Sequence, residues 1–159
     1  VYLEEVIRTT IRLVRPGLIR SNVRLNVQLH EPVPLVRGHT GQLSQVLVNL
    51  INNSRQALEG KESGSISIEG SFTDREVYLR VQDNGPGIAP QDLTRIFDPF
   101  FTTKPKGEGT GLGLSISRDI LSRYGGRLEV RNLPTGGAQF QICLPIARLN
   151  PLTPKVKSA

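Results

Sequence analysis

The chain has 159 residues, 37% of them hydrophobic and 21% charged, which is typical of one soluble globular domain with a single core. No apolar stretch approaches the length of a membrane span, and no signal-peptide pattern is present. The net charge of +6 could indicate nucleic-acid binding, but Lys and Arg are scattered, so we expect no nucleic-acid partner. The single Cys143 is typical of a reducing compartment, so we expect a cytoplasmic location. Because the chain starts at Val1 and not at Met, we expect it to be a piece of a longer protein.

The first part of the chain predicts two helices and a strand. Apolar residues at helical spacing begin at Leu3, and Pro16-Gly17 is expected to break or kink this helix. Alternation over Val23–Leu29 predicts a half-buried strand. A second helix is expected over Thr40–Leu58, with one continuous apolar stripe.

The second part predicts two strand pairs and two more helices. Ser65–Phe72 and Val77–Asp83 read as an antiparallel pair, and two further strands are expected around Leu128–Val130 and Ala138–Leu144. Short helices are expected over Pro90–Phe97 and from about Thr110 to Tyr124. We expect a domain over residues 1–149 and a disordered tail over 150–159. This order predicts a mixed, mostly antiparallel sheet covered on one face by helices.

Neutral amides line one flank of the predicted Thr40–Leu58 helix. At about 100° per residue, Gln42, Asn49, Asn53 and Gln56 fall beside the apolar stripe, where a solvated flank would normally carry Lys and Glu. The row is either a helix side with capping or interface amides, or the wall of a polar pocket. In a pocket, carboxamide oxygens can ligate a hard cation such as Mg²⁺. The row alone leaves both interpretations open.

Asp83 continues the buried row of the strand that precedes it. Alternate side chains of a strand share a face, so this carboxylate is expected to be buried and to need a donor. Asp-Asn-Gly is also common turn chemistry. However, Gly85 and Gly87 would let the backbone pass close to a ligand, and an exocyclic amine such as that of adenine would satisfy the carboxylate.

Two later stretches are suited to phosphate. Three of the five Phe lie close together, Phe97, Phe100 and Phe101, and they are expected to be partly core. They are followed by the hydroxyls of Thr102 and Thr103 and the ammonium of Lys104, which are suited to phosphate oxygens. The glycine run 107–114 is either an anion-binding loop at a helix start or only a flexible loop. Its spelling excludes a P-loop and the dinucleotide fingerprint.

In this order, the stretches resemble the catalytic and ATP-binding domain of bacterial sensor histidine kinases, over about Leu3 to Pro145. The spelling Phe-Phe-Thr-Thr-Lys further resembles the nitrogen-regulatory and dicarboxylate-sensor branch. The matching stretches are Asn49–Asn53 for the N box, Asp83–Gly87 for the first glycine box, Phe97–Phe101 for the F box, Gly109–Leu114 for the second glycine box, and Gly136–Phe140 for the glycine-bearing turn before the last strand.

The resemblance implies a fold, cofactors and site residues. The fold is the α/β sandwich, a Bergerat-type ATP-binding fold, shared with gyrase, mismatch-repair ATPases and heat-shock chaperones, and the cofactors are ATP and Mg²⁺. It implies that Asn53 ligates Mg²⁺ with Asn49 beside it, that Asp83 reads the adenine amino group, and that Lys104 contacts phosphate. Residues from about 98 to 111 would form a mobile lid over the triphosphate.

The implied catalytic residues are Asn49, Asn53 and Lys104. The chain departs from the usual pattern at Ser54, where Ala is usual, and at His39, where Asp commonly precedes the N-box helix. The implied nucleotide-binding residues are Asn53, Gln56, Asp83, Gly85, Gly87, Ile88, Phe97, Thr102, Thr103, Lys104, Gly109, Thr110, Gly111, Leu112 and Gly113.

The position one turn before Asn53 bears on the reaction. Related hydrolytic ATPases carry a Glu there to activate water, whereas this chain has Asn49, and an amide takes no proton at neutral pH. We therefore expect phosphoryl transfer to an outside acceptor. In histidine kinases the acceptor is a histidine on a separate dimerising helical hairpin. His30 is followed by Pro32 and is not expected to lie on a helix.

We therefore expect the acceptor domain to lie N-terminal to Val1. The expected partners are ATP, that dimerisation domain of the same full-length protein, and a downstream response regulator, with the isolated domain monomeric. The alternatives are an ATP-binding sensor module without transfer activity and a slow ATPase.

Overall fold

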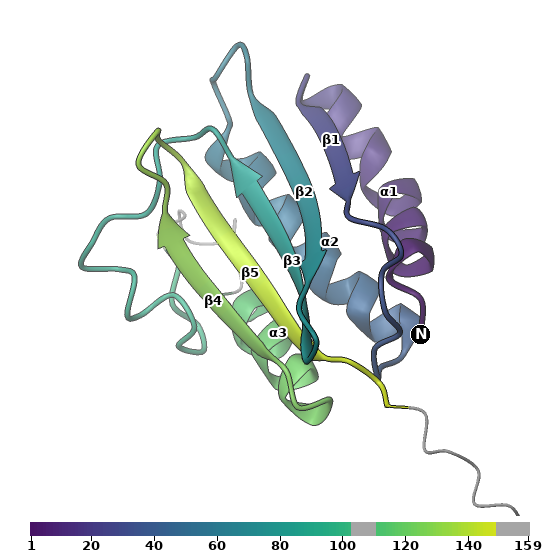
Figure 1. Cartoon of the computed structure of the whole chain (residues 1–159). Helices are drawn as coiled ribbons and strands as arrows, with labels where there is room; N and C mark the ends of the chain where they lie inside the picture. The colour runs from purple at the N-terminus through teal and green to yellow at the C-terminus, as the bar shows by residue number, and fades with distance from the viewer. Residues whose placement is uncertain (103–110, 149–159) are drawn as a thin grey trace, which may run out of the picture.

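The computed structural model describes residues 1–102 and 111–148. Within these residues, five strands form one sheet in the order β1-β2-β3-β5-β4, and three helices cover one of its faces (Figure 1). The elements in chain order are α1 (Leu3–Arg20), β1 (Arg24–Leu29), α2 (Thr40–Ala57), β2 (Ser65–Phe72), β3 (Glu76–Asp83), α3 (Gly113–Arg123), β4 (Arg127–Asn132) and β5 (Ala138–Pro145).

β1 pairs parallel to β2, and every other neighbouring pair in the sheet is antiparallel. This confirms the predicted mixed, mostly antiparallel sheet and the predicted β2–β3 hairpin. β3 is the central strand, between β2 and β5. The antiparallel registers place the end of β3, the end of β4 and the start of β5 at one end of the sheet, called here the Asp83 end. The start of β3, the start of β4 and the end of β5 form the opposite end, the Glu76 end.

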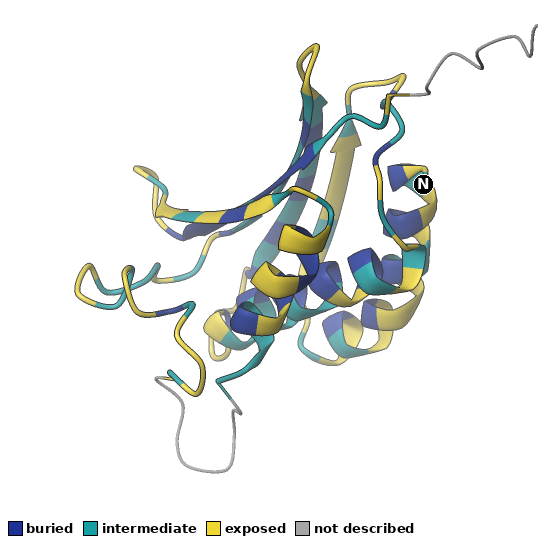
Figure 2. Cartoon of the chain, turned by 90° about the horizontal axis from the view of Figure 1, so that it is seen from below, coloured by how far each residue is buried: buried dark blue, intermediate teal, exposed yellow. Residues whose placement is uncertain are grey.

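The core lies between the sheet and the helices. β3 alternates strictly, with Val77, Leu79 and Val81 buried toward the helices. The apolar stripe of α2 meets this face, and its Val46 and Leu50 are fully buried. Figure 2 shows buried residues on the inner sides of sheet and helices and exposed residues on their outer sides. Burying each such aliphatic side chain stabilises the fold by roughly 1.5–3 kcal/mol.

Two local predictions were wrong, and a third was wrong in part. α1 is not broken at Pro16 but continues to Arg20, so of the two predicted effects a kink there stays a prediction; Pro16 is exposed, so water can bind the carbonyl that its missing N–H leaves free. The segment 90–97 forms successive turns and no α-helix. Its backbone hydrogen bonds include ones between residues three positions apart, such as the bond from the Arg95 N–H to the Asp92 carbonyl at 2.8 Å. α3 begins at Gly113 and not near Thr110, because Gly111 has a φ of +69°, which a right-handed helix excludes.

No helix within the described residues combines the length and the apolar character needed to cross a membrane. The predicted tail, residues 150–159, lies outside the described residues, so the domain boundary at 149 stays a prediction.

Candidate functional site

Asp83 ends β3 with its side chain on the buried face, as predicted. It is 5% exposed. Its Oδ1 accepts the backbone N–H of Gly85 at 2.9 Å and the backbone N–H of Ala138 at 3.3 Å. No group in the described part of the chain donates to Oδ2. The protein therefore orients this carboxylate through one oxygen and leaves the other available to a ligand donor.

The loop after Asp83 packs tightly against two other segments. A Cβ on Gly85 would lie 3.3 Å from the Ala57 carbonyl oxygen at the end of α2. On the other side, Gly137 lies so close to Asp83 that a Cβ there would stand 1.9 Å from the Asp83 carbonyl oxygen. Gly137 also has a φ of +90°. Only glycine fits this position, which fixes the β4–β5 turn against the first glycine box.

The amide flank of α2 divides into two parts. Asn49 donates its Nδ2 to the Gly113 carbonyl at 3.3 Å and to Ser117 Oγ at 3.2 Å, and Gln42 accepts a hydrogen bond from the Tyr124 hydroxyl. These two amides join α2 to α3, as the interface interpretation predicts. They also bring the N box against the start of the helix that follows the second glycine box.

The other amides are not used in this way. Asn53 is half-buried and has no hydrogen-bond partner within residues 1–102 and 111–148. The Oε1 of Gln56 and the Oγ of Ser54 are buried, also without a partner there. Buried polar atoms are nearly always hydrogen-bonded, so unsatisfied ones point to a missing ligand or water. This part of α2 favours the pocket interpretation.

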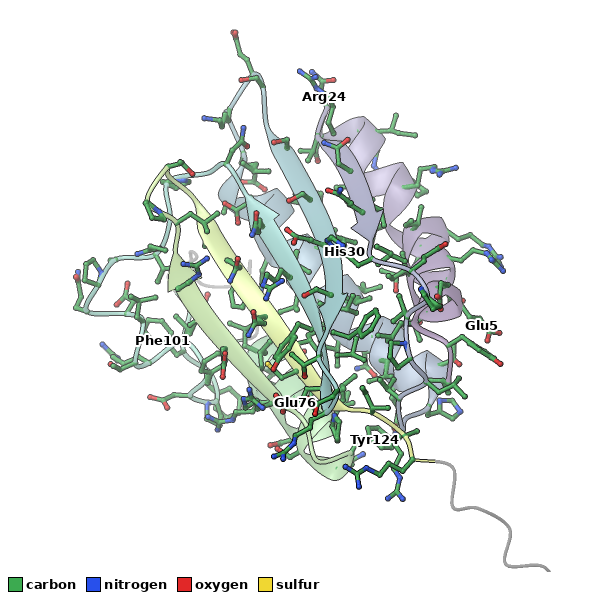
Figure 3. All side chains as sticks on the ribbon, viewed as in Figure 1. Glu5, Arg24, His30, Glu76, Phe101 and Tyr124 are labelled. Atoms are coloured by element: carbon green, nitrogen blue, oxygen red, sulfur yellow. The ribbon has the colours of Figure 1, made fainter. Side chains whose placement is uncertain are left out.

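The F box contacts the second glycine box directly. Phe100 donates its backbone N–H to the Gly111 carbonyl at 2.9 Å, and Phe100 itself is 73% exposed. Phe97 and Phe101 pack against the core, which confirms the partly core prediction. The guanidinium of Arg95 lies 4.7 Å from the centre of the Phe101 ring. Figure 3 shows Phe101 in the segment that follows β3.

The structure thus brings together the residues that the sequence singled out on α2, after β3 and before α3. Thr103, Lys104, Gly109 and Thr110, with most of the predicted lid, lie outside the described residues. Within the described residues, no group of three His, Cys, Asp or Glu side chains is placed to hold a metal ion. One contact was missed: Asn132, on β4, binds the backbone of Ile88. Asn132 belongs to no motif, and only the register of β4 with β5 could have placed it there.

Comparison with known proteins agrees with this arrangement. The family model described as histidine kinase-, DNA gyrase B- and HSP90-like ATPase matches residues 38–148. The two-component sensor PprA of Pseudomonas aeruginosa is 44% identical over 142 residues, which cover 82% of this chain and 15% of PprA. The sensor histidine kinase ZraS of Salmonella typhimurium is 36% identical over 146 residues, which cover 92% of this chain and 31% of ZraS.

Solved structures give the same result. The catalytic domain of histidine kinase ThkA is 31% identical with a TM-score of 0.80, covering 92% of this chain and 96% of that one, which confirms the α/β sandwich. Full-length ShkA, solved in complex with AMPPNP, is 28% identical with a TM-score of 0.78 and is matched over 31% of its length. The chain spans less than a third of PprA and of ZraS. This chain belongs to the histidine kinase-, DNA gyrase B- and HSP90-like ATPase family.

Proposed function

We propose that this chain is the ATP-binding catalytic domain of a sensor histidine kinase, and that it transfers the γ-phosphoryl group of Mg·ATP to a histidine on a separate dimerisation domain. The observation that carries the proposal is the buried Asp83 carboxylate. The protein satisfies its Oδ1, and no described group donates to its Oδ2. A neutral ligand with an exocyclic amine, such as adenine, would complete its hydrogen bonding.

The loop around Asp83 supports the base assignment. Gly85, Gly87 and Ile88 follow the carboxylate directly, and Gln56 offers a buried, unsatisfied oxygen on α2. Phe97 follows this loop in the chain, is half-buried, and would supply apolar surface to the base. In this proposal, these residues surround the base, and Asp83 selects adenine through its amino group.

The phosphates would lie toward the start of α3. Backbone N–H groups at a helix start carry partial positive charge, and this suits anions. Gly111, Leu112 and Gly113 form this start, and Gly113 is held by Asn49. Thr102 lies at the start of the F-box-to-glycine-box segment. The resemblance of the sequence to histidine kinases implies further phosphate contacts in that segment, from Thr103, Lys104, Gly109 and Thr110. Lys104 is the proposed cation on the γ-phosphate.

The residues on α2 fit a magnesium ion held mainly by phosphate. Mg²⁺ prefers oxygen ligands and keeps several waters, so one protein carboxamide together with phosphate oxygens is a suitable donor set. Asn53 is half-buried without a described partner and would supply that oxygen. When bound, the ion would neutralise charge on the phosphates during transfer. Asn49 is held to α3 and would position the glycine box.

The same residues argue against rapid hydrolysis. Asn49 lies one turn before Asn53, where a water-activating carboxylate would be needed, and an amide cannot accept the proton. Transfer to an outside nucleophile is therefore favoured over a slow ATPase. The similarity to ShkA, which was solved with an ATP analogue, supports nucleotide binding. We propose the dimerisation domain of the full-length protein and a response regulator as partners, and a cytoplasmic location.

Radiolabelled ATP tests the proposal in two steps. The domain alone should bind ATP, should not label itself and should release phosphate slowly. With the dimerising hairpin of its own full-length protein added, label should move to the hairpin histidine. Asn53→Ala should stop the transfer, while Asn26→Ala, at an exposed position on the edge strand β1, should not. Binding without transfer would favour the sensor module, and fast phosphate release regardless of the hairpin would favour an ATPase.

A further inference from the structure

Asn132, the last residue of β4, binds the backbone of Ile88 with both ends of its carboxamide. Its Oδ1 accepts the Ile88 N–H at 2.8 Å, and its Nδ2 donates to the Ile88 carbonyl at 2.7 Å. A carboxamide in this position pairs with the loop as a neighbouring strand would. Figure 1 shows the end of β4 beside the loop that leaves β3.

The loop has few other restraints at this point. Its start is held by the Gly85 N–H on Asp83 and by Asn84, which bonds Ser65 N at 2.8 Å and Ser63 O at 2.9 Å. Beyond Pro86, the only hydrogen bonds from described residues to the backbone of Gly87 and Ile88 come from Asn132. The side chain also lies against Gly87, because a Cβ there would stand 2.9 Å from Asn132 Oδ1.

The same hairpin connects Asn132 to Asp83. Asn132 is in register with Ala138 across the β4–β5 pair, and the Ala138 N–H donates to Asp83 Oδ1 at 3.3 Å. One hairpin therefore orients the carboxylate through β5 and the far side of the loop through β4. This hairpin contacts both sides of the loop, Asp83 through β5 and Ile88 through β4.

We propose that Asn132 is a positioning residue for the base subsite: it holds Gly87 and Ile88 at the distance from Asp83 that an adenine ring requires. This inference rests on the proposed nucleotide site. Without Asn132, the loop would have to be ordered by the ligand, and ordering a segment on binding lowers affinity. The effect should therefore fall on nucleotide binding and not on the chemical step.

The pairing requires one donor and one acceptor on the same side chain. Asp in place of Asn132 keeps an acceptor for the Ile88 N–H but sets a charged oxygen against the Ile88 carbonyl, where the amide nitrogen stood. Asp has nearly the same shape as Asn, so it separates the hydrogen-bond requirement from simple space filling. Ala removes both bonds.

Calorimetric titration of the chain with ADP is the test, with Asn132→Ala, Asn132→Asp and the exposed control Asn26→Ala. We expect both Asn132 variants to bind ADP about tenfold more weakly than wild type, and the control to match wild type. Faster amide exchange at Ile88 should accompany the loss. In the full-length kinase, the KM for ATP should rise about tenfold with kcat within about twofold of wild type.

Two results would overturn the inference while leaving the proposed function intact. One is wild-type ADP affinity in Asn132→Asp, and the other is loss of kcat with an unchanged KM. If Asn132→Ala is unfolded by circular dichroism, the Asp variant, which keeps the size and shape of the side chain, decides. Failure of wild type to bind ADP would instead overturn the proposed function, and this inference with it.

Discussion

The central strand β3 carries a carboxylate at each end, and the protein holds the two in opposite ways. Asp83 is buried and accepts hydrogen bonds from backbone N–H groups through one oxygen. Glu76 lies on the open face of the sheet and accepts hydrogen bonds from the side chains of Arg127 and Tyr78. At the Asp83 end, side chains hold loops in place. At the Glu76 end, side chains satisfy one another.

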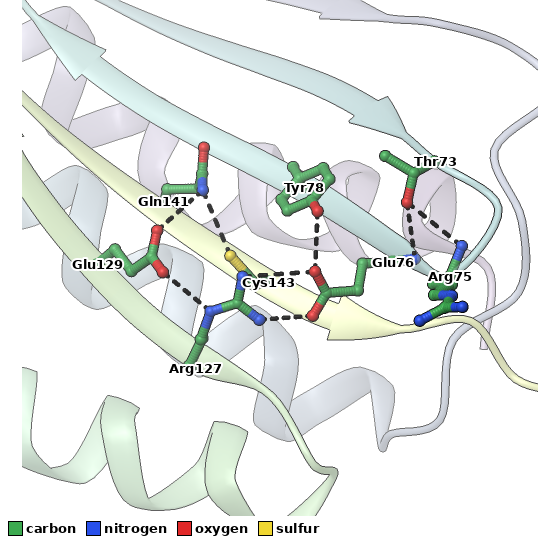
Figure 4. Close-up of polar contacts among 8 residues, drawn as sticks. All are labelled: Thr73, Arg75, Glu76, Tyr78, Arg127, Glu129, Gln141 and Cys143. Atoms are coloured by element: carbon green, nitrogen blue, oxygen red, sulfur yellow. Dashed lines mark hydrogen bonds and ion pairs between the residues drawn. The ribbon is translucent and has the colours of Figure 1, made fainter.

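In the Glu76 network, both oxygens of Glu76 and both oxygens of Glu129 already accept a hydrogen bond from a neighbouring side chain (Figure 4). Arg127 also binds Glu129 at 2.9 Å, and Gln141 donates to Glu129 at 3.1 Å. Hydrogen bonds from Arg127 and then Tyr78 lower the pKa of Glu76, while burial raises the pKa of the Cys143 thiol. The difference indicates which of the two polar clusters is suited to bind a ligand that donates a hydrogen bond. Both ends are rich in polar groups, but in the described residues the Glu76 carboxylate has a donor on each oxygen, whereas the buried Asp83 carboxylate has donors on Oδ1 alone.

The largest effect is expected at the contact that closes the Asp83 end. Gly137→Ala would drive a methyl group into the Asp83 carbonyl at a φ of +90°, and should destabilise the fold by about 3–4 kcal/mol and abolish ADP binding. Denaturant unfolding measures the change. Gly136→Ala is the matched control, because it has a φ of +101° but no atom within 4 Å of its Cβ. It should cost only about 1–2 kcal/mol. Equal losses in the two variants would show that the close approach has no importance.

Asp83→Asn should separate binding from folding at the same end. Asn keeps an oxygen for the Gly85 and Ala138 N–H groups, so the melting temperature should change little. The charge-assisted bond to adenine would be lost, which is worth about 1.5–3 kcal/mol, or roughly 10–150-fold in the dissociation constant for ATP analogues. Calorimetric titration checks this. Unchanged affinity in the folded variant would remove Asp83 from the site.

The sequence predicted the regular elements of the fold better than the loops around the Asp83 end. Within the described residues, periodicity predicted all five strands and all three helices, because one-sided burial imposes a period of two or 3.6 residues. It also predicted the buried carboxylate of Asp83. Periodicity gave the wrong result where backbone dihedral angles determine whether a helix forms and where it begins. The left-handed φ of Gly111 means that α3 begins only after it, and the segment 90–97 forms turns without forming a helix.

The amide flank of α2 shows a different limit. Spacing grouped Gln42, Asn49, Asn53 and Gln56 on one side, but could not tell that the first two bind α3 while the other two remain without a described partner. That depends on which helix packs on which part of α2. The Asn132 contact with Ile88 also needs the tertiary fold, because it joins residues 44 positions apart.

The smallest effect is expected at the Glu76 end, and it should depend on pH. The folded pKa of Glu76 lies below its ordinary value of 4.5, so its ionised form stabilises the fold above about pH 4.5, and this contribution is lost as the pH falls through the folded pKa. Glu76→Gln should therefore lower the melting temperature slightly at pH 7, and the difference from wild type should narrow as the pH falls below 4.5. The exposed Glu62→Gln should show no such difference. ADP affinity at pH 7 should be unchanged, because this end of the sheet contributes nothing to the proposed site. A difference that does not narrow below pH 4.5 would assign the loss to packing, and a weakened ADP affinity would show that the two ends of β3 are coupled.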